Sequence, residues 1–219
     1  MRRLAVFARS PVPGRVKTRL SPALPAPLAA ALYRGLLADT FAAAGAARVD
    51  ERWACWADEP GPAPGEFLER TQQGGSLGER LQHAVGRLLT ADGDRALILG
   101  SDTPPLTGAH IDEAFVALEQ HDLVLGPTLD GGYWCIGLKC AVPELFRDIP
   151  WSTREVLTRT LVRAQGAGLG VATVATLGDL DTPEDLALLM GALAAGEPAC
   201  GRHARAALLA MGMLPSRLG

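Results

Sequence analysis

A short apolar run that ends in a carboxylate and two prolines places the strongest constraint on this chain. Residues 96–99 read Ala-Leu-Ile-Leu, and residues 100–105 continue Gly-Ser-Asp-Thr-Pro-Pro. The run suits a buried strand and is too short for a helix, and the prolines stop regular structure after it. Asp102 is therefore predicted at the carboxyl end of a central strand, where open α/β sheets bind ligands. Two roles are open here: Asp102 binds a cation, or it caps a helix that begins near Leu106.

The alternation of apolar runs and helical spacing predicts the fold class. Strands are predicted at residues 4–8, 51–57, 96–99, 123–126 and 170–176. Helices are predicted between them, at residues 25–47, after Ser76, at 107–120, after Ser152 or Thr153 as N-cap, from 183 and around 206–211. This order favours an α/β fold, a three-layer α/β/α arrangement with a mostly parallel sheet.

Composition excludes several classes of protein. The chain has 219 residues, 48% of them hydrophobic, and a net charge of −3, which is typical of a soluble globular protein and gives no basic footprint for nucleic acid. The four cysteines form no C-x-x-C pair, and no apolar run is long enough for a membrane span or a secretory signal. We therefore expect one domain in a cytoplasmic protein.

A basic loop follows the first predicted strand. Residues 9–20 contain two prolines and a glycine, which exclude regular structure through Gly14, and four basic residues fall within eleven positions. Such a loop suits a polyphosphate, with Lys17 as a point charge and Arg19 as a bidentate donor. It is neither a Walker A loop nor a G-x-G-x-x-G loop. The alternative is a solvated basic loop.

Acidic residues gather in one loop after the last predicted strand: Asp179, Asp181, Glu184 and Asp185. Helix capping by Asp181 or Thr182 explains one of these acids, and the others need a cation or solvent. Asp102 and Asp181 both fall at strand ends, which favours a divalent cation held by the two carboxylates. Hard oxygen ligands favour Mg or Mn, with Lys17 and Arg19 on the phosphates.

Two glycine-containing segments have both structural and functional interpretations. Ser76 and Glu79 fit a capping box, while Gln73 and its glycine neighbours could let backbone approach a nucleotide base. Residues 130–134 read Asp-Gly-Gly-Tyr-Trp, a turn signal followed by two aromatic residues. Because successive strand residues face opposite sides, one aromatic residue can be core and the other a ligand contact.

Together these segments resemble a known family. The stretches that carry the resemblance are 7–20, 73–81, 100–104, 126–137, 151–153 and 179–186. They are similar to the nucleotide-diphospho-sugar transferase superfamily, with the GT-A fold, and more closely to the bacterial family DUF2064. The family pattern usually has lysine where this chain has Arg9, which keeps the charge. The resemblance implies a nucleotide-binding half at 1–105 and an acceptor-binding half at 106–195, and it does not extend to a helical tail at 196–219.

The resemblance also implies roles for individual residues. Asp102 and Asp181 resemble the metal-side residues of the superfamily. The implied nucleotide-binding residues are Ala8, Arg9, Gly14, Lys17, Arg19, Gln73 and Ser101. The implied acceptor or sugar contacts are Asp130, Gly131, Gly132, Tyr133 and Trp151. Lys17, Arg19 and Asp130 are the candidate catalytic residues.

The implied function is metal-dependent transfer from a nucleotide-activated donor to a small-molecule acceptor, with glycosyl transfer from a nucleotide-diphospho-sugar as the first interpretation. In that reaction the acceptor attacks the anomeric carbon and a nucleoside diphosphate leaves. A guanylyltransferase-like nucleotidyltransferase, in which pyrophosphate leaves a nucleoside triphosphate, is the alternative. A nucleotide-binding protein without turnover is a third, and a homodimer stays open.

Overall fold

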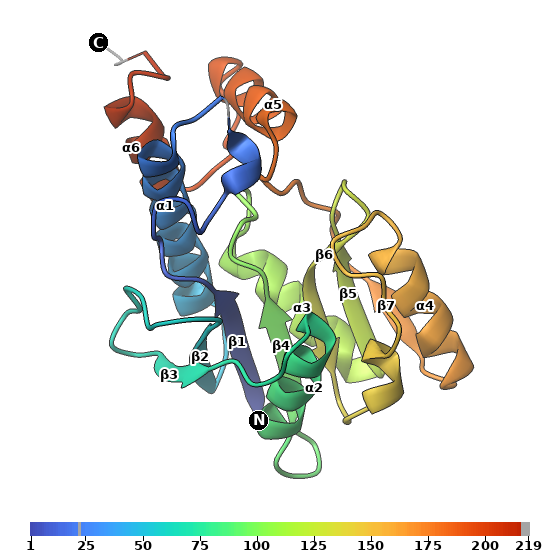
Figure 1. Ribbon diagram of the computed structural model, residues 1–219. Helices are drawn as coiled ribbons and strands as arrows, with labels where there is room; N and C mark the ends of the chain where they lie inside the picture. Colours follow the sequence, from blue (N-terminus) through green and yellow to red (C-terminus); the bar gives the residue numbers. More distant parts are fainter. Residues whose placement is uncertain (22, 216–219) are drawn as a thin grey trace.

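A seven-stranded sheet runs through the middle of the molecule (Figure 1). The computed structural model describes residues 1–21 and 23–215. The strand order is β3-β2-β1-β4-β6-β5-β7, and β6 runs antiparallel to both of its neighbours while the other pairs are parallel. The strands are β1 (Arg2–Ala8), β2 (Glu51–Trp56), β3 (Leu68–Thr71), β4 (Arg95–Leu99), β5 (Leu123–Pro127), β6 (Tyr133–Leu138) and β7 (Val171–Thr173). The predicted mostly parallel α/β sheet is confirmed.

Helices cover both faces of the sheet. They are α1 (Ala26–Ala46), α2 (Leu77–Leu88), α3 (Gly108–Gln120), α4 (Val156–Gly166), α5 (Pro183–Ala194) and α6 (Arg202–Ala210), with short 3-10 helices η1 (Thr18–Leu20) and η2 (Pro143–Phe146). In β4, Leu97 and Leu99 pack with α1 and α3, whereas Ala96 and Ile98 pack with α2, α4 and η2. Both faces are buried, so the strand is apolar at successive positions rather than at alternate ones.

The described part of the carboxyl-terminal tail packs on α1. Leucines of α5 and α6 form a third apolar cluster with α1 and η1. Asp39 of α1 accepts hydrogen bonds from the backbone N–H groups of His203 (3.0 Å) and Ala204 (2.8 Å), which satisfies donors at the start of α6. A side chain at Gly35 would place its Cβ 2.8 Å from the His203 carbonyl oxygen, so the helices approach closely there. Residues 216–219 of the tail lie outside the described residues.

Three local details differ from the pattern-based expectations. β3 was not expected, because three of its four residues are exposed and it forms the edge of the sheet. β7 is shorter than residues 170–176. The predicted N-cap at Ser152 or Thr153 is wrong: the residue before α4 is Glu155, without a side-chain cap, and the Thr153 hydroxyl donates to the Pro150 carbonyl instead.

The capping box at Ser76 and Glu79 is confirmed, with both of its hydrogen bonds present at the start of α2. Within the part of the chain that the structure describes, no helix is long and apolar enough to cross a membrane.

Candidate active site

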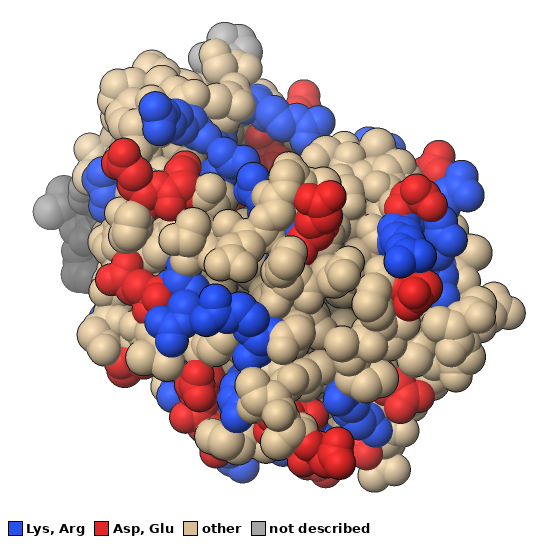
Figure 2. All heavy atoms as spheres, turned by 60° about the horizontal axis from the view of Figure 1, so that its bottom comes forward, with Lys and Arg blue, Asp and Glu red and all other residues tan. Residues whose placement is uncertain are grey.

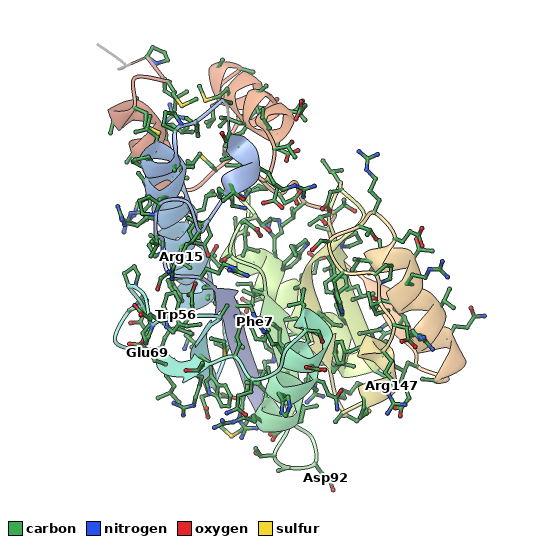
Figure 3. The ribbon with its side chains drawn as sticks, in the orientation of Figure 1. Phe7, Arg15, Trp56, Glu69, Asp92 and Arg147 are labelled. Carbon is green, nitrogen blue, oxygen red and sulfur yellow. The ribbon has the colours of Figure 1, made fainter. Side chains whose placement is uncertain are left out.

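A cleft of about 940 Å³ opens where β1 and β4 end, at the carboxyl edge of the sheet. One wall is the loop after β1, and Figure 3 labels Arg15 in this loop and Phe7 in β1, both of which line the cleft. The other walls are the end of β4, the turn before β6 and the loop before α4. This edge is where open α/β sheets bind ligands, and it is where the sequence places its basic loop and Asp102.

Lys17 joins the two predicted metal ligands. Its Nζ lies 2.9 Å from Oδ2 of Asp102 and 2.6 Å from Oδ1 of Asp181. The lysine side chain is 4% exposed, against 37% and 35% for the two carboxylates. The ammonium group between them is therefore largely shielded from solvent, whereas both carboxylates, which line the cleft, remain partly exposed.

Burial by itself would lower the pKa of Lys17, but the attraction of Asp102 and Asp181 outweighs it and raises that pKa above the ordinary lysine value. Lys17 is therefore a permanent positive charge at neutral pH in this arrangement. The prediction placed Lys17 on a phosphate, whereas here its ammonium group is the counter-ion of the carboxylate pair.

Buried anchors hold these charges together although they are 85 and 164 positions apart along the chain. Val16 and Leu20 flank the lysine and are buried. The backbone N–H of Leu180 donates to the Asp102 carbonyl over 3.0 Å, which ties the loop before α5 to the end of β4. Lys17 itself has φ 49°, in the left-handed region that costs a non-glycine residue free energy.

Asp102 does not cap the following helix. Thr107 is the N-cap of α3 and forms a capping box with His110. One of the two roles that were open for Asp102 is therefore excluded, and its described side-chain partner is Lys17.

Tyr33 of α1 is a site residue that the sequence analysis missed. It is buried, its hydroxyl accepts a hydrogen bond from the Arg9 backbone N–H (3.1 Å), and it forms another with the Ser101 hydroxyl (2.8 Å). The Lys17 Nζ lies 5.9 Å from the centre of its ring. Tyr33 thus fixes the loop after β1 against the end of β4. The available signal was a tyrosine on an apolar helix face, since a buried hydroxyl usually has a partner.

Arginines supply positive charge on the open side of the cleft. Arg9, Arg15 and Arg19 line it and are exposed. None of the three forms a salt bridge within the described residues. Their charge is available to an anionic ligand.

Asp130 lines the cleft but also holds its own turn. Its Oδ1 accepts hydrogen bonds from the Thr128 hydroxyl (2.6 Å) and the Gly132 backbone N–H (2.9 Å). Gly131 has φ 91°, and a Cβ there would lie 2.3 Å from the Arg154 carbonyl oxygen, so the turn requires glycine.

The two aromatic residues after this turn separate as the strand alternation predicts. Tyr133 lines the cleft and packs edge-on against Trp151, with ring centres 6.5 Å apart. Trp134 is buried, and its indole N–H donates to the Ala175 carbonyl over 2.9 Å, although part of it also borders the cleft.

The cleft brings most of the predicted site residues together. Those that line it are Ala8, Arg9, Lys17, Arg19, Ser101, Asp102, Asp130, Gly132, Tyr133, Trp151 and Asp181. Gly14, Gln73 and Gly131 are not among its lining residues. Gln72 lines the cleft in place of Gln73, and its side-chain amide donates to the Cys55 carbonyl over 2.8 Å.

A further acid lies close to this carboxylate pair. Asp179 is half-buried, and burial, followed by the negative charges of Asp130 and Asp102, raises its pKa to about 7. Asp179 is therefore partly protonated at neutral pH, because burial and the neighbouring carboxylates disfavour its charged form.

The donor set fits a metal that is shared with a substrate. No group of three or more metal-ligating side chains occurs among the described residues, so they supply no all-protein metal centre. Mg²⁺, however, binds through one or two carboxylates plus substrate phosphates. Asp102 and Asp181, both facing a cleft with unpaired arginines, match that requirement.

Comparison with known proteins identifies relatives that share the fold. A crystal structure of a putative nucleotide-diphospho-sugar transferase from Desulfovibrio desulfuricans G20 is 30% identical, has a TM-score of 0.78, and the match covers 86% of each chain. A CMP:2-keto-3-deoxy-manno-octonic acid synthetase complexed with CTP is 14% identical, with a TM-score of 0.52, over 89% of this chain and 99% of that one.

The bifunctional IspDF from Campylobacter jejuni is 10% identical, with a TM-score of 0.52, over 85% of this chain and 53% of that one. At these identities the synthetase and IspDF share the fold alone. No curated protein sequence matches the chain. The model of the family described as "uncharacterized protein conserved in bacteria (DUF2064)" matches residues 28–153. The chain thus has the nucleotide-diphospho-sugar transferase fold and belongs to the DUF2064 family.

Proposed function

We propose that this protein is a metal-dependent glycosyltransferase that uses a nucleotide-diphospho-sugar. The observation that carries the proposal is the charge arrangement of the cleft. Unpaired arginines line one wall, and a carboxylate pair faces the same space from the ends of two other segments. A diphosphate bridged to a divalent cation is complementary to both groups at once. The name of the D. desulfuricans relative points to the same donor class.

Each wall has its own part in the proposed reaction. Arg9, Arg15 and Arg19 bind the donor phosphates, and Asp102 and Asp181 hold the Mg or Mn. When bound, the metal neutralises the charge that develops on the leaving nucleoside diphosphate. On the other side of the cleft, the rings of Tyr133 and Trp151 pack against the sugar or the acceptor, and Asp130 keeps the turn beside them in place.

The test is product analysis with single donors. The purified protein is incubated with Mn²⁺, individual nucleotide sugars and a panel of small acceptors, and nucleoside diphosphate release is measured. We expect release that needs both the metal and an acceptor and that is lost in Asp102→Asn. Release of pyrophosphate from a nucleoside triphosphate, dependent on a phosphorylated acceptor, would overturn sugar transfer.

Nucleotidyl transfer is the second candidate, because one loop brings four basic side chains to the cleft. Arg15, Lys17 and Arg19 all line the cleft, and Arg9 adds a fourth charge. A triphosphate would use all four. The two reactions are distinguished in the same assay by the leaving group. Thermal stabilisation by nucleotides that is independent of metal and of Asp102, without either product, would instead indicate binding alone.

A further inference from the structure

We propose that Lys17 is a displaceable counter-ion that closes the carboxylate pair to divalent cations until the phosphates of the donor draw its ammonium group away. This inference rests on the proposed function, because it concerns how the same cleft takes up metal and donor. It adds an order to binding: the phosphates and the cation enter together, and neither binds tightly alone.

The positions of the charged atoms carry the inference. The Lys17 ammonium contacts both Asp102 (2.9 Å) and Asp181 (2.6 Å), so it occupies the space between the two carboxylates. A cation held by both acids needs that same space, and an ammonium group and a divalent cation repel each other there. Lys17 must therefore move before both carboxylates can serve as ligands.

Lys17 has nowhere favourable to go in the absence of an anion. Its side chain is 4% exposed, Val16 before it and Leu20 three positions after it are buried, and the centre of the Tyr33 ring lies 5.9 Å from its Nζ. Removing both carboxylates from a buried ammonium leaves an uncompensated charge, which is strongly unfavourable. A cation that binds alone must bear that cost.

Donor phosphates remove that cost. Arg15 and Arg19 lie in the same loop as Lys17 and line the cleft, so phosphates bound there lie within the reach of a long, flexible lysine side chain. The Lys17 ammonium group then contacts phosphate oxygens in place of the two carboxylates, and Asp102 and Asp181 become available to a divalent cation. No covalent bond is made or broken, because the exchange needs only rotation about the side-chain bonds of Lys17. By linkage, metal and donor must strengthen each other's binding by the same factor.

The experiment measures Mn²⁺ binding to the nucleotide-free protein by electron paramagnetic resonance, which requires no turnover. Lys17→Met and Lys17→Gln remove the ammonium group, and Arg19→Met removes a charge from the same loop that contacts neither carboxylate. We expect both Lys17 variants to bind Mn²⁺ alone roughly 5- to 150-fold more tightly than wild type, the usual range for coupled sites. Arg19→Met should match wild type, and adding Asp102→Asn to Lys17→Met should abolish the gain.

Melting temperatures with and without Mn²⁺ provide a second measurement, which also shows that the variants are folded. The Lys17 variants should gain more thermal stability from Mn²⁺ than wild type does. Equal Mn²⁺ affinity and equal stabilisation in wild type and both Lys17 variants would overturn the counter-ion role, even if sugar transfer is observed. Tighter Mn²⁺ binding by the variants, with no transfer by wild type, would instead retain the counter-ion and reject the proposed function.

Discussion

Each edge of the sheet carries a buried cation beside carboxylates, and the two clusters differ in how their acceptors are satisfied. At the amino edge, where β1 and β4 begin, Asp94 is 3% exposed and accepts from the Arg3 guanidinium. Its Oδ2 also accepts from the backbone N–H groups of Thr90 (3.0 Å) and Ala91 (2.8 Å). At the carboxyl edge, Asp102 and Asp181 share one ammonium group and keep more than a third of their surface open.

The difference separates a structural ion pair from a candidate binding site. A carboxylate with several donors and no exposure has no capacity left for a ligand, whereas an exposed pair with one partner has. Figure 2, which brings the lower side of Figure 1 forward, shows positive and negative side chains interspersed over that face. The cleft instead gathers the exposed carboxylate pair and three arginines that form no salt bridge among the described residues.

The sharpest way to test this comparison is Asp102→Asn. If the carboxyl-edge pair is functional, donor turnover should fall by roughly 10²- to 10³-fold, the loss seen when one electrostatic contact to a transition state is removed. The melting temperature, followed by circular dichroism, should fall less than in Asp94→Asn. If activity instead falls only in proportion to the loss of folded protein, the functional role of the Asp102–Asp181 pair is contradicted.

Asp94→Asn should give the reverse result, a large fall in melting temperature with turnover retained below the transition. The Arg3 hydrogen bond holds the pKa of Asp94 well below its usual range. The folded pKa lies below the unfolded one, so ionised Asp94 stabilises the fold above about pH 4, and this contribution is lost as pH falls further. The difference between wild type and Asp94→Asn, measured by thermal melting, should therefore shrink on acidification. A constant difference would show that the charge of Asp94 is unimportant.

Tyr33→Phe tests how the carboxyl edge is positioned. The variant loses hydrogen bonds to Arg9 and Ser101 but keeps the ring, so we expect a loss of about 1–2 kcal/mol in the free energy of unfolding. Because the loop after β1 is then less well fixed, turnover should fall while the folded structure persists. Urea unfolding and donor kinetics measure the two effects. A stability loss with unchanged kinetics would make Tyr33 purely structural.

Asp179→Asn should produce the smallest effect, and one that depends on pH. The pKa of Asp179 is raised to about 7 in the folded protein, above its unfolded value of about 4. Between these pH values the folded chain retains a proton that the unfolded chain has lost, so stability falls as pH rises.

Asp179→Asn removes the destabilisation that ionised Asp179 causes. At pH 8 its free energy of unfolding should exceed that of wild type by about 1 kcal/mol, a figure that allows for partial solvent exposure. At pH 4 the two proteins should be equally stable. Melting curves in a metal chelator measure this, and an equal advantage at both pH values would contradict it.

Local patterns predicted much of the fold. The predicted capping box at Ser76 depends on residues three positions apart, and it forms. Of the two caps that the sequence left open for α5, Thr182 is the N-cap and Asp181 is not. The N-cap at Ser152 or Thr153 failed because capping residues also suit turns, and the chain there makes a turn before α4 begins. β3 was missed because an exposed edge strand lacks the apolar pattern that marks buried strands.

The candidate site was only partly visible from the sequence. Strand ends placed Asp102 at the ligand edge, and charge clustering placed Lys17 and Asp181 near it. Three predicted contacts, Gly14, Gln73 and Gly131, do not line the cleft, and Tyr33 was overlooked. A buried tyrosine has the same helical spacing as any core residue, so its hydroxyl contacts are invisible to periodicity.

The sequence by itself determined the α/β class, the carboxylate at the end of β4 and the basic loop after β1, because hydrophobic spacing and chain-breaking residues act over a few positions. Only the tertiary structure decided that Lys17 lies between Asp102 and Asp181, since that contact depends on the strand order and on the Leu180 hydrogen bond. Charges far apart in sequence pair according to which segments become neighbours, and the neighbours are selected by packing of the whole core.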